Sequence, residues 1–262
     1  MISAPSDLAD AQLTDPQRVR YRRNLDVVGL GAAGQRRLLD ARVLVVGAGG
    51  LGSPVLLYLA AAGVGTIGVA DGDTVETANL QRQMIHRQAD QGVNKAESAA
   101  ARLRALNPEV TVETHPVMVT PGSAADLFAT YDLVLDCCDS FGAKFVVADA
   151  AQAVGVPIIW GAAVGMQGQV SVFGVPDAAG RVAWLRDLFP VEPPMGSYPL
   201  ATEIGVLGAM VGQVGSLMAT EAIKLLAGFG QPLVGRVWIM DAAAGRWDVV
   251  PFVPSGRSGA SP

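Results

Sequence analysis

The sequence contains few of the residues that ligate metals or form disulfide bonds. Its 262 residues include only two histidines, His86 and His115, and two cysteines, the adjacent Cys137 and Cys138. Cysteines that are neighbours in sequence rarely pair, so we expect free thiols in a reducing cytoplasm. A closed zinc site needs four thiolate or imidazole ligands, and these four residues do not have the spacing of one. The composition therefore predicts a cytoplasmic protein without zinc.

Charge is also scarce, at 16% of the residues, and its balance is acidic, with a net charge of −5. This argues against a basic surface that coats nucleic acid. Residues 1–17 lack a basic stretch followed by an apolar core, so we expect no signal peptide. The stretch from Ile204 to Ile223 is long enough to span a bilayer, but Gln213 and the charged Glu221 within it favour a buried helix. We therefore expect neither a nucleic-acid partner nor a membrane partner.

Hydrophobic residues, in contrast, make up half of the chain, which is enough to bury a sizeable core. Short apolar runs at 43–46, 66–70 and 132–136 predict buried parallel strands, and the segments between them are typical of helices. This alternation predicts an α/β fold with a Rossmann-like, doubly wound and mostly parallel sheet. After Gly161 polar and apolar residues alternate, which predicts antiparallel strands that extend the sheet on its C-terminal side. The other expected elements are helices at about 54–62, 94–106, 124–129, 143–154 and 202–226, and strands at about 110–114, 157–160, 235–240 and 247–252.

The order of these elements divides the chain into three parts. Residues 1–41 are expected to form an N-terminal helical arm, whose first helix begins with Asp15 as its cap. Residues 42–253 are expected to form one α/β domain. Residues 254–262, which are rich in glycine and serine, are expected to be a disordered tail.

A glycine-rich turn follows the first expected strand. Residues 47–52 read Gly-Ala-Gly-Gly-Leu-Gly and precede a helix, and Asp71 ends the next strand. Gly47 and Gly49 allow the backbone to approach a ligand, and Gly52 allows close packing of the helix on the strand. The helix N-terminus favours phosphate, and a carboxylate at the end of the second strand can bind ribose hydroxyls. The pattern favours a nucleotide site over an ordinary turn, but it does not distinguish NAD from ATP.

The segment after this carboxylate favours a triphosphate. It is rich in polar and cationic side chains: Asn79, Arg82, Gln83 and Lys95. A hydride-transfer site has no need for them, whereas cleavage of a triphosphate requires neutralisation of the charge that builds on pyrophosphate. A solvated charged surface is the alternative for Arg82 and Lys95.

Together with Asp136-Cys-Cys-Asp139, these motifs closely resemble the ubiquitin-activating-enzyme superfamily, and within it the MoeB/ThiF-type adenylyltransferases. The similarity spans about residues 20–250. It implies that residues 42–253 are a ThiF-like adenylation domain. Such a domain uses ATP to activate the C-terminal glycine of a small ubiquitin-fold sulfur carrier, in molybdopterin, thiamine or related synthesis. Because the attacking carboxylate is already a nucleophile, the reaction needs positioning and charge neutralisation and no general base.

The resemblance also implies roles for single residues. Asp139 would help to place Mg²⁺ near the α-phosphate. Arg23, in the segment Arg-Tyr-Arg-Arg-Asn-Leu, would be an arginine finger that reaches into a partner subunit, which makes the active unit a homodimer. The implied catalytic residues are Arg23, Arg82, Lys95 and Asp139, and the implied nucleotide-binding residues are Gly47, Gly49, Gly50, Gly52, Asp71, Asp73, Asn79 and Gln83.

The chain departs from this family in three respects. It lacks the two CxxC pairs that bind zinc in many relatives. Ala201 stands where some relatives have a crossover-loop cysteine that links covalently to the carrier, so we expect the chain to stop at the acyl-adenylate. A separate sulfurtransferase would then deliver sulfur. Finally, Ser140 and Lys144 replace the usual Asn and Arg after Asp139.

Three other functions remain open at the level of the sequence. The same fold could adenylate another carboxylate, such as a peptide C-terminus or a modified nucleoside. A non-catalytic homologue could bind nucleotide or carrier without turnover, although the retained polar residues count against it. An NAD-dependent oxidoreductase is disfavoured by the cations at the phosphate site. The carrier and the pathway are not identified by the sequence.

Overall fold

The central sheet has eight strands in the order β3-β2-β1-β4-β5-β6-β7-β8, in a computed structural model that describes residues 13–194, 196–198 and 201–254. Strands β1 to β5 pair in parallel, and β6, β7 and β8 continue the sheet in antiparallel fashion. The predicted fold class is therefore confirmed. The strands are β1 (Arg42–Val46), β2 (Thr66–Ala70), β3 (Thr111–His115), β4 (Leu133–Asp136), β5 (Ile158–Val164), β6 (Gln167–Phe173), β7 (Arg236–Asp241) and β8 (Arg246–Pro251).

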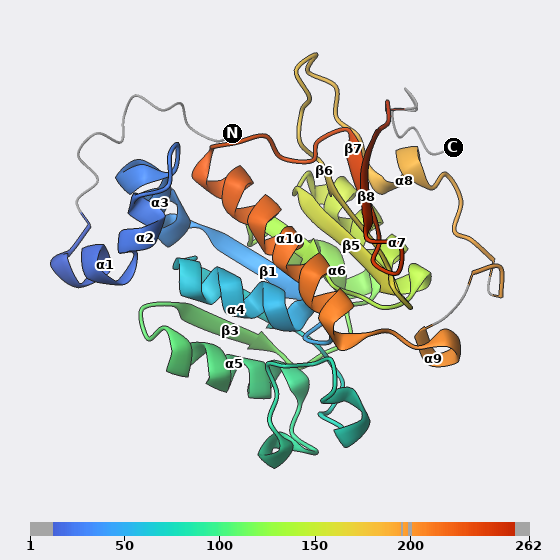
Figure 1. Ribbon diagram of the computed structural model, residues 1–262, viewed down its shortest axis with the longest axis horizontal. Coiled ribbons are helices and arrows are strands. Elements are labelled where there is room, and N and C mark those ends of the chain that lie inside the picture. The colour runs from blue at the N-terminus through green and yellow to red at the C-terminus, as the bar shows by residue number, and fades with distance from the viewer. Residues whose placement is uncertain (1–12, 195, 199–200, 255–262) are drawn as a thin grey trace.

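Helices cover both faces of the sheet (Figure 1). One hydrophobic core lies under α3 (Gly31–Asp40), α4 (Gly52–Ala62), α5 (Lys95–Leu106) and α10 (Gly208–Ala227). A second core lies on the other face, under α6 (Pro121–Phe128), α7 (Phe141–Val154) and the short α8 (Leu185–Leu188). The remaining helical segments are α1 (Asp15–Arg20), α2 (Arg22–Leu25), α9 (Ala201–Ile204) and the 3₁₀ turns η2 (Thr77–Asn79) and η3 (Gln88–Asp90).

Several helix ends follow from local sequence. Helix α4 ends at Gly63, whose φ of 82° is in the left-handed region that glycine favours. Asn94 caps α5 by accepting hydrogen bonds from backbone N–H groups of the first turn. The prediction that Asp15 caps the first helix is wrong, because the Thr14 hydroxyl accepts from the Gln17 amide and the Gln17 side chain accepts from the Thr14 amide. This reciprocal pair leaves Asp15 as the first helical residue.

The long helix predicted at 202–226 is interrupted, so that α9 and α10 are separate. Gly205 lies between them with a φ of 76°, and its carbonyl accepts a hydrogen bond from the Gly165 amide at 2.9 Å. The segment between the helices thus bonds to the residue that follows β5, a tertiary contact that competes with helix continuation. In the described part of the chain, no helix is both long enough and apolar enough to cross a bilayer.

The N-terminal helices are anchored through Tyr21. Its ring is buried against Gly63, where a Cβ would overlap it, and the Asn107 side chain donates a hydrogen bond to its hydroxyl at 2.9 Å. Helix α3 contributes Leu38 to the larger core. The division into an arm, a domain and a tail stays a prediction, and residues 255–262 of the expected disordered tail lie outside the described residues.

The strand register decides which loops meet. Val46, the last residue of β1, is level with Ala70 on β2 and with Asp136 on β4. The residues that follow these three strands therefore lie side by side at one edge of the sheet. This edge carries the glycine turn and the carboxylates singled out in the sequence.

Candidate functional site

A cavity of about 440 Å³ opens at this edge of the sheet. A second hollow, of about 590 Å³, lies between α4 and α10, but no charged side chain lines it. The first cavity is therefore the candidate site for a charged ligand. The predicted site residues that line it are Gly47, Gly49, Gly50, Asp71, Asp73, Arg82, Gln83, Lys95 and Asp139.

The glycine turn is shaped to hold an anion. Gly47 has a φ of 95°, and a Cβ there would lie 2.9 Å from the Cys137 carbonyl oxygen. A Cβ on Gly52 would overlap the Gly47 carbonyl, which bears out the close packing expected of this glycine. The amides of Gly49 and Gly50 donate to no acceptor in the described part of the chain. These two N–H groups at the start of α4 are available to phosphate oxygens.

Asp71 is held in a fixed orientation at the end of β2. One carboxylate oxygen accepts a hydrogen bond from the Ala48 amide at 2.8 Å, and the other accepts from the Asp73 amide at 2.9 Å. Each oxygen can accept at least one further hydrogen bond. The carboxylate is thus oriented by the turn itself and remains able to bind ribose hydroxyls.

The two predicted cations are held by different means. The side chain of Lys95 is only 7% exposed, and its Nζ lies 2.9 Å from Asp73 Oδ2. Lys95 is therefore not part of a solvated surface. Arg82 donates from Nη2 to Asn79 Oδ1 at 3.0 Å. Asn79 is not among the residues that line the cavity, and its predicted place on the phosphates stays a prediction.

Asp139 follows β4 and differs from the carboxylates above because no described residue is its partner. It lines the cavity and makes no hydrogen bond or ion pair within the described residues. Its neighbour Ser140 caps α7, since its hydroxyl accepts from the Ala143 amide at 3.3 Å. Asparagine is an equally good cap, so the replacement of the family's Asn by Ser140 preserves this local structure.

Lys144 pairs with a carboxylate that the sequence reasoning did not assign. Its Nζ lies 3.5 Å from Asp136 Oδ2 and 2.5 Å from the Gly161 carbonyl oxygen, and both charged side chains are buried. Lys144 lines the cavity, and the Asp136 carboxylate already balances its charge. Sequence reasoning also missed Trp160, which lines the cavity, is 1% exposed and has an indole N–H without an acceptor among the described residues. Nothing in the sequence indicates that the Trp160 indole lines this cavity.

The adjacent cysteines are free thiols that line the cavity. Burial raises the pKa of both Cys137 and Cys138, and the nearby Asp136 carboxylate raises it further. They are thus protonated at neutral pH, which suits the structural role expected of them. The described residues bring together no group of three or more histidine, cysteine or acidic side chains that could hold a metal ion.

Arg23 is not brought to this cavity. It lies on α2, its side chain is 94% exposed, and its Nη1 is 3.6 Å from Asp26 Oδ2. Helix α2 lies beyond the start of β1, at the opposite end of that strand from the cavity (Figure 1). Arg23 can therefore take no part in the site of its own chain in this structure.

Known proteins share this chain's sequence over most of its length. Residues 21–258 match the model of the ThiF family. A probable adenylyltransferase/sulfurtransferase, MoeZ of Mycobacterium tuberculosis, is 50% identical over 230 residues, which cover 88% of this chain and 59% of MoeZ. The sulfur carrier protein adenylyltransferase of Thermus thermophilus is 47% identical over 224 residues, which cover 85% of this chain and 83% of the relative.

Solved structures support the fold. A crystal structure of E. coli MccB has a TM-score of 0.79 at 21% identity, and the match covers 94% of this chain and 75% of MccB. At that identity the likeness concerns the fold alone. The chain spans 59% of the length of the MoeZ relative, and the family model covers nearly all of the described residues. Because the family model matches residues 21–258, most of the sequence, the chain belongs to the ThiF family.

Proposed function

We propose that this chain is an ATP-dependent adenylyltransferase that activates the C-terminal glycine carboxylate of a small ubiquitin-fold sulfur carrier. One observation carries the proposal: a single cavity combines free turn amides, an oriented ribose carboxylate, two cations and the unpartnered Asp139. The name of the Thermus thermophilus relative, which is 47% identical, supports the reaction and the class of carboxylate substrate.

The proposed reaction is an in-line displacement at the α-phosphorus. A carboxylate oxygen of the carrier forms a bond to the α-phosphorus. At the same time the bond between the α-phosphorus and the oxygen that bridges it to the β-phosphate breaks, which gives an acyl-adenylate and pyrophosphate. Negative charge develops on pyrophosphate, and Arg82 and Lys95 line the same cavity. Fixed cations in a site that excludes water stabilise such charge far better than solvent does. Lys95 is suited to this role because its ion pair and its burial hold it in place.

The carboxylate of Asp139 fits the magnesium ion that accompanies ATP. Mg²⁺ prefers oxygen ligands and is bound through one or two carboxylates together with the phosphates of its substrate. Asp139 offers two oxygens without internal partners, next to the glycine turn. When bound, Mg²⁺ would supply charge neutralisation at the phosphate oxygens.

The active unit in this proposal is a homodimer, in which Arg23 acts on the site of the partner. The support is geometric, since Arg23 is exposed and remote from the cavity of its own chain. A mixed dimer of Arg23→Ala with a site-dead Asp139→Ala chain should recover the activity of one site, half that of a wild-type dimer, because one intact site receives one intact finger. Mixed dimers without any recovery would contradict an arginine that acts in trans.

Sulfur transfer is assigned to a separate protein. Ala201 offers no thiol in the crossover segment, and the two cysteines of the cavity are held as protonated thiols by burial, which raises their pKa. The chain would therefore release or present an acyl-adenylate, and a sulfurtransferase would attack it.

ATP–pyrophosphate exchange tests the proposal directly. The expected result is exchange that depends on a carrier ending in Gly-Gly and disappears when the last glycine is removed. Exchange with a short peptide alone would shift the substrate to a peptide carboxylate. ATP binding without exchange in the presence of any carrier would favour a non-catalytic homologue.

A further inference from the structure

His86 lies buried directly behind the glycine turn. It is 6% exposed, and its two ring nitrogens contact two different parts of the chain. Nε2 is 2.9 Å from the Ala48 carbonyl oxygen, inside the turn, and Nδ1 is 2.9 Å from the Ser98 hydroxyl on α5. His86 does not line the cavity, and the proposed reaction makes no use of it.

The partners of the ring decide which nitrogen carries the proton. A carbonyl oxygen can only accept, so Nε2 must be protonated. Burial lowers the pKa of His86 and outweighs the hydrogen bond to the Ala48 carbonyl, which raises it. The charge of Lys95 lowers the pKa further, and Asp71 and Asp90 raise it with smaller effect. The ring is therefore neutral at neutral pH with its proton on Nε2. The Ser98 hydroxyl lies 2.9 Å from the unprotonated Nδ1 and 3.1 Å from Asp90 Oδ2, and it shares its one proton between these two acceptors.

Both polar groups of Ala48 are thereby fixed. Its amide donates to Asp71 at 2.8 Å, and its carbonyl accepts from His86. Ala48 is the residue between Gly47 and Gly49, so the two bonds hold the turn at its centre. Ser98 lies one helical turn after Lys95 on α5, so the ring also ties the turn to the helix that carries this cation.

We propose that His86 is a positioning residue that fixes the glycine turn and Asp71 in their nucleotide-binding arrangement before ATP arrives. Without this clamp, Ala48 keeps only its bond to Asp71, and the turn must be ordered by the nucleotide itself. Ordering the turn then reduces the free energy of ATP binding. The affinity for ATP therefore decreases, while the rate at saturating ATP is retained. The inference rests on the proposed function only in requiring that the cavity binds ATP.

Two substitutions separate the clamp from general packing. In His86→Gln the amide N–H₂ group reaches the position of Nε2 and can still donate to the Ala48 carbonyl. In His86→Asn the shorter amide reaches only the Nδ1 side, so a buried carbonyl loses its donor. We expect the Kd of ATP, measured by isothermal titration calorimetry, to rise about ten-fold in the Asn variant, as for an unsatisfied buried acceptor. The Gln variant should stay within about three-fold of wild type.

His115→Asn is the matched control. His115 also makes a histidine hydrogen bond, of 2.8 Å to the Tyr131 hydroxyl, but it does not line the cavity. We expect this variant to bind ATP like wild type. Because His86→Asn could also disturb folding, NMR of the wild-type ring provides a second test, and it should show the Nε2–H tautomer at neutral pH.

The outcomes distinguish this inference from the proposed function. An unchanged Kd in His86→Asn, equal losses in the Asn and Gln variants, or an Nδ1–H tautomer would overturn the clamp. A fall in the exchange rate at saturating ATP with an unchanged Kd would overturn it as well. Wild-type protein that binds ATP but catalyses no exchange would contradict the proposed function, while the Kd comparison would still decide the role of His86.

Discussion

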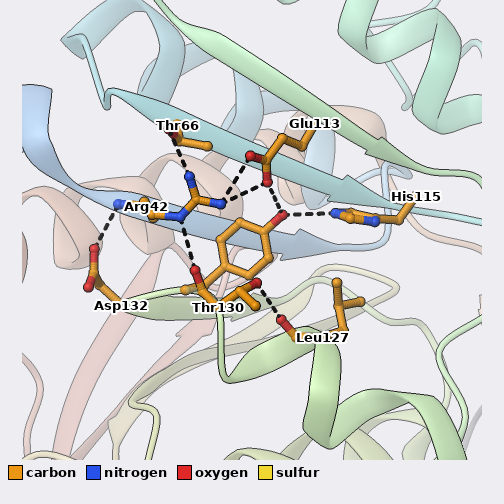
Figure 2. A network of polar contacts seen from close by, with 8 residues as sticks. Arg42, Thr66, Glu113, His115, Leu127, Thr130 and Asp132 are labelled. Carbon is orange, nitrogen blue, oxygen red and sulfur yellow. Dashed lines mark hydrogen bonds and ion pairs between the residues drawn. The ribbon is translucent and has the colours of Figure 1, made fainter.

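Two polar clusters on the parallel half of the sheet have similar residues and different surroundings. Figure 2 shows the cluster that spans β1 to β3, in which Arg42 bonds to both carboxylate oxygens of Glu113 at 3.0 Å. The Tyr131 hydroxyl donates to the same carboxylate at 2.8 Å and lies 2.8 Å from His115 Nε2. None of these residues lines the cavity. The other cluster is the cavity itself, where Asp139 and the turn amides have no partner in the described chain.

This difference distinguishes charged groups that stabilise the fold from charged groups that are available to a ligand. In the Arg42 cluster, each charged group is satisfied by another residue of the protein, so the cluster is complete without a ligand. In the cavity, the amides of Gly49 and Gly50 and the exposed carboxylate of Asp139 have no partner within the described residues, so they are available to a ligand. Substitutions in the first cluster should therefore change stability, and substitutions in the second should change activity.

The Lys144–Asp136 pair is the sharpest test of this distinction, because Lys144 lines the cavity and is also paired with a buried carboxylate. Lys144→Met leaves the fully buried Asp136 carboxylate without its cation, and we expect a loss of about 3–5 kcal/mol in the free energy of unfolding. Lys144→Arg, the residue usual in the family, keeps the charge and should cost much less. Urea denaturation measures both, and equal stability of the Met variant and wild type would refute the structural role of this pair.

The next largest effects should be on catalysis alone. Arg82→Ala and Asp139→Ala each remove a group that faces the proposed phosphates, and we expect pyrophosphate exchange to fall at least about 100-fold. The urea midpoint of Asp139→Ala should remain at the wild-type value, because Asp139 has no partner to lose within the described residues, and Arg82→Ala should lose little, because it removes only exposed or half-buried local hydrogen bonds. A large stability loss with only a small change in exchange would place these residues in the structural class.

Tyr131→Phe should have the opposite signature. It removes the hydroxyl that bonds to Glu113 and His115, and we expect the free energy of unfolding to fall by about 1 kcal/mol. Exchange activity at 25 °C should be unchanged. A variant with wild-type stability and reduced exchange would show that the Arg42 cluster contributes to the site.

The smallest effect concerns pH. Burial by itself raises the pKa of Glu113, but the hydrogen bonds from Tyr131 and Arg42 outweigh it, so this pKa lies below its usual value. A depressed folded-state pKa stabilises the protein above the unfolded-state value, and this contribution is lost as the pH falls through the folded-state pKa. The stability difference between wild type and Glu113→Gln should therefore shrink between about pH 6 and pH 3. If this stability difference grew on acidification, the pKa of Glu113 would be raised in the folded protein and not lowered.

The sequence predicts the glycine-turn half of the molecule well because its signals are local. Three local features are examples: the apolar strand that precedes Gly47, the helix that begins after Asn94, and the acidic residue that follows β2. Each is encoded within a few neighbouring residues. The strand register then brings these local features together without further information. The family resemblance is confirmed, and Ser140 shows how a departure from the motif can keep its local role as a cap.

The remainder of the site depends on contacts between distant segments. The break between α9 and α10 lies at Gly205, which has a left-handed φ and bonds to the distant Gly165, a contact that the hydrophobic pattern of 202–226 does not reveal. The burial of Trp160 and the bond from His86 to Ala48 likewise arise only when the chain is folded. Asn79 stays a predicted phosphate ligand, and only the structure shows that its side chain accepts a hydrogen bond from Arg82.

The most direct test of the central claim is the mass of the carrier after reaction. A ubiquitin-fold carrier ending in Gly-Gly would be mixed with the purified chain, ATP and Mg²⁺, quenched in acid and measured by intact-mass spectrometry. The account predicts an added adenylyl group on the carrier, matched by released pyrophosphate and absent with Asp139→Ala. A carrier of unchanged mass, although wild-type protein binds both ATP and carrier, would contradict it.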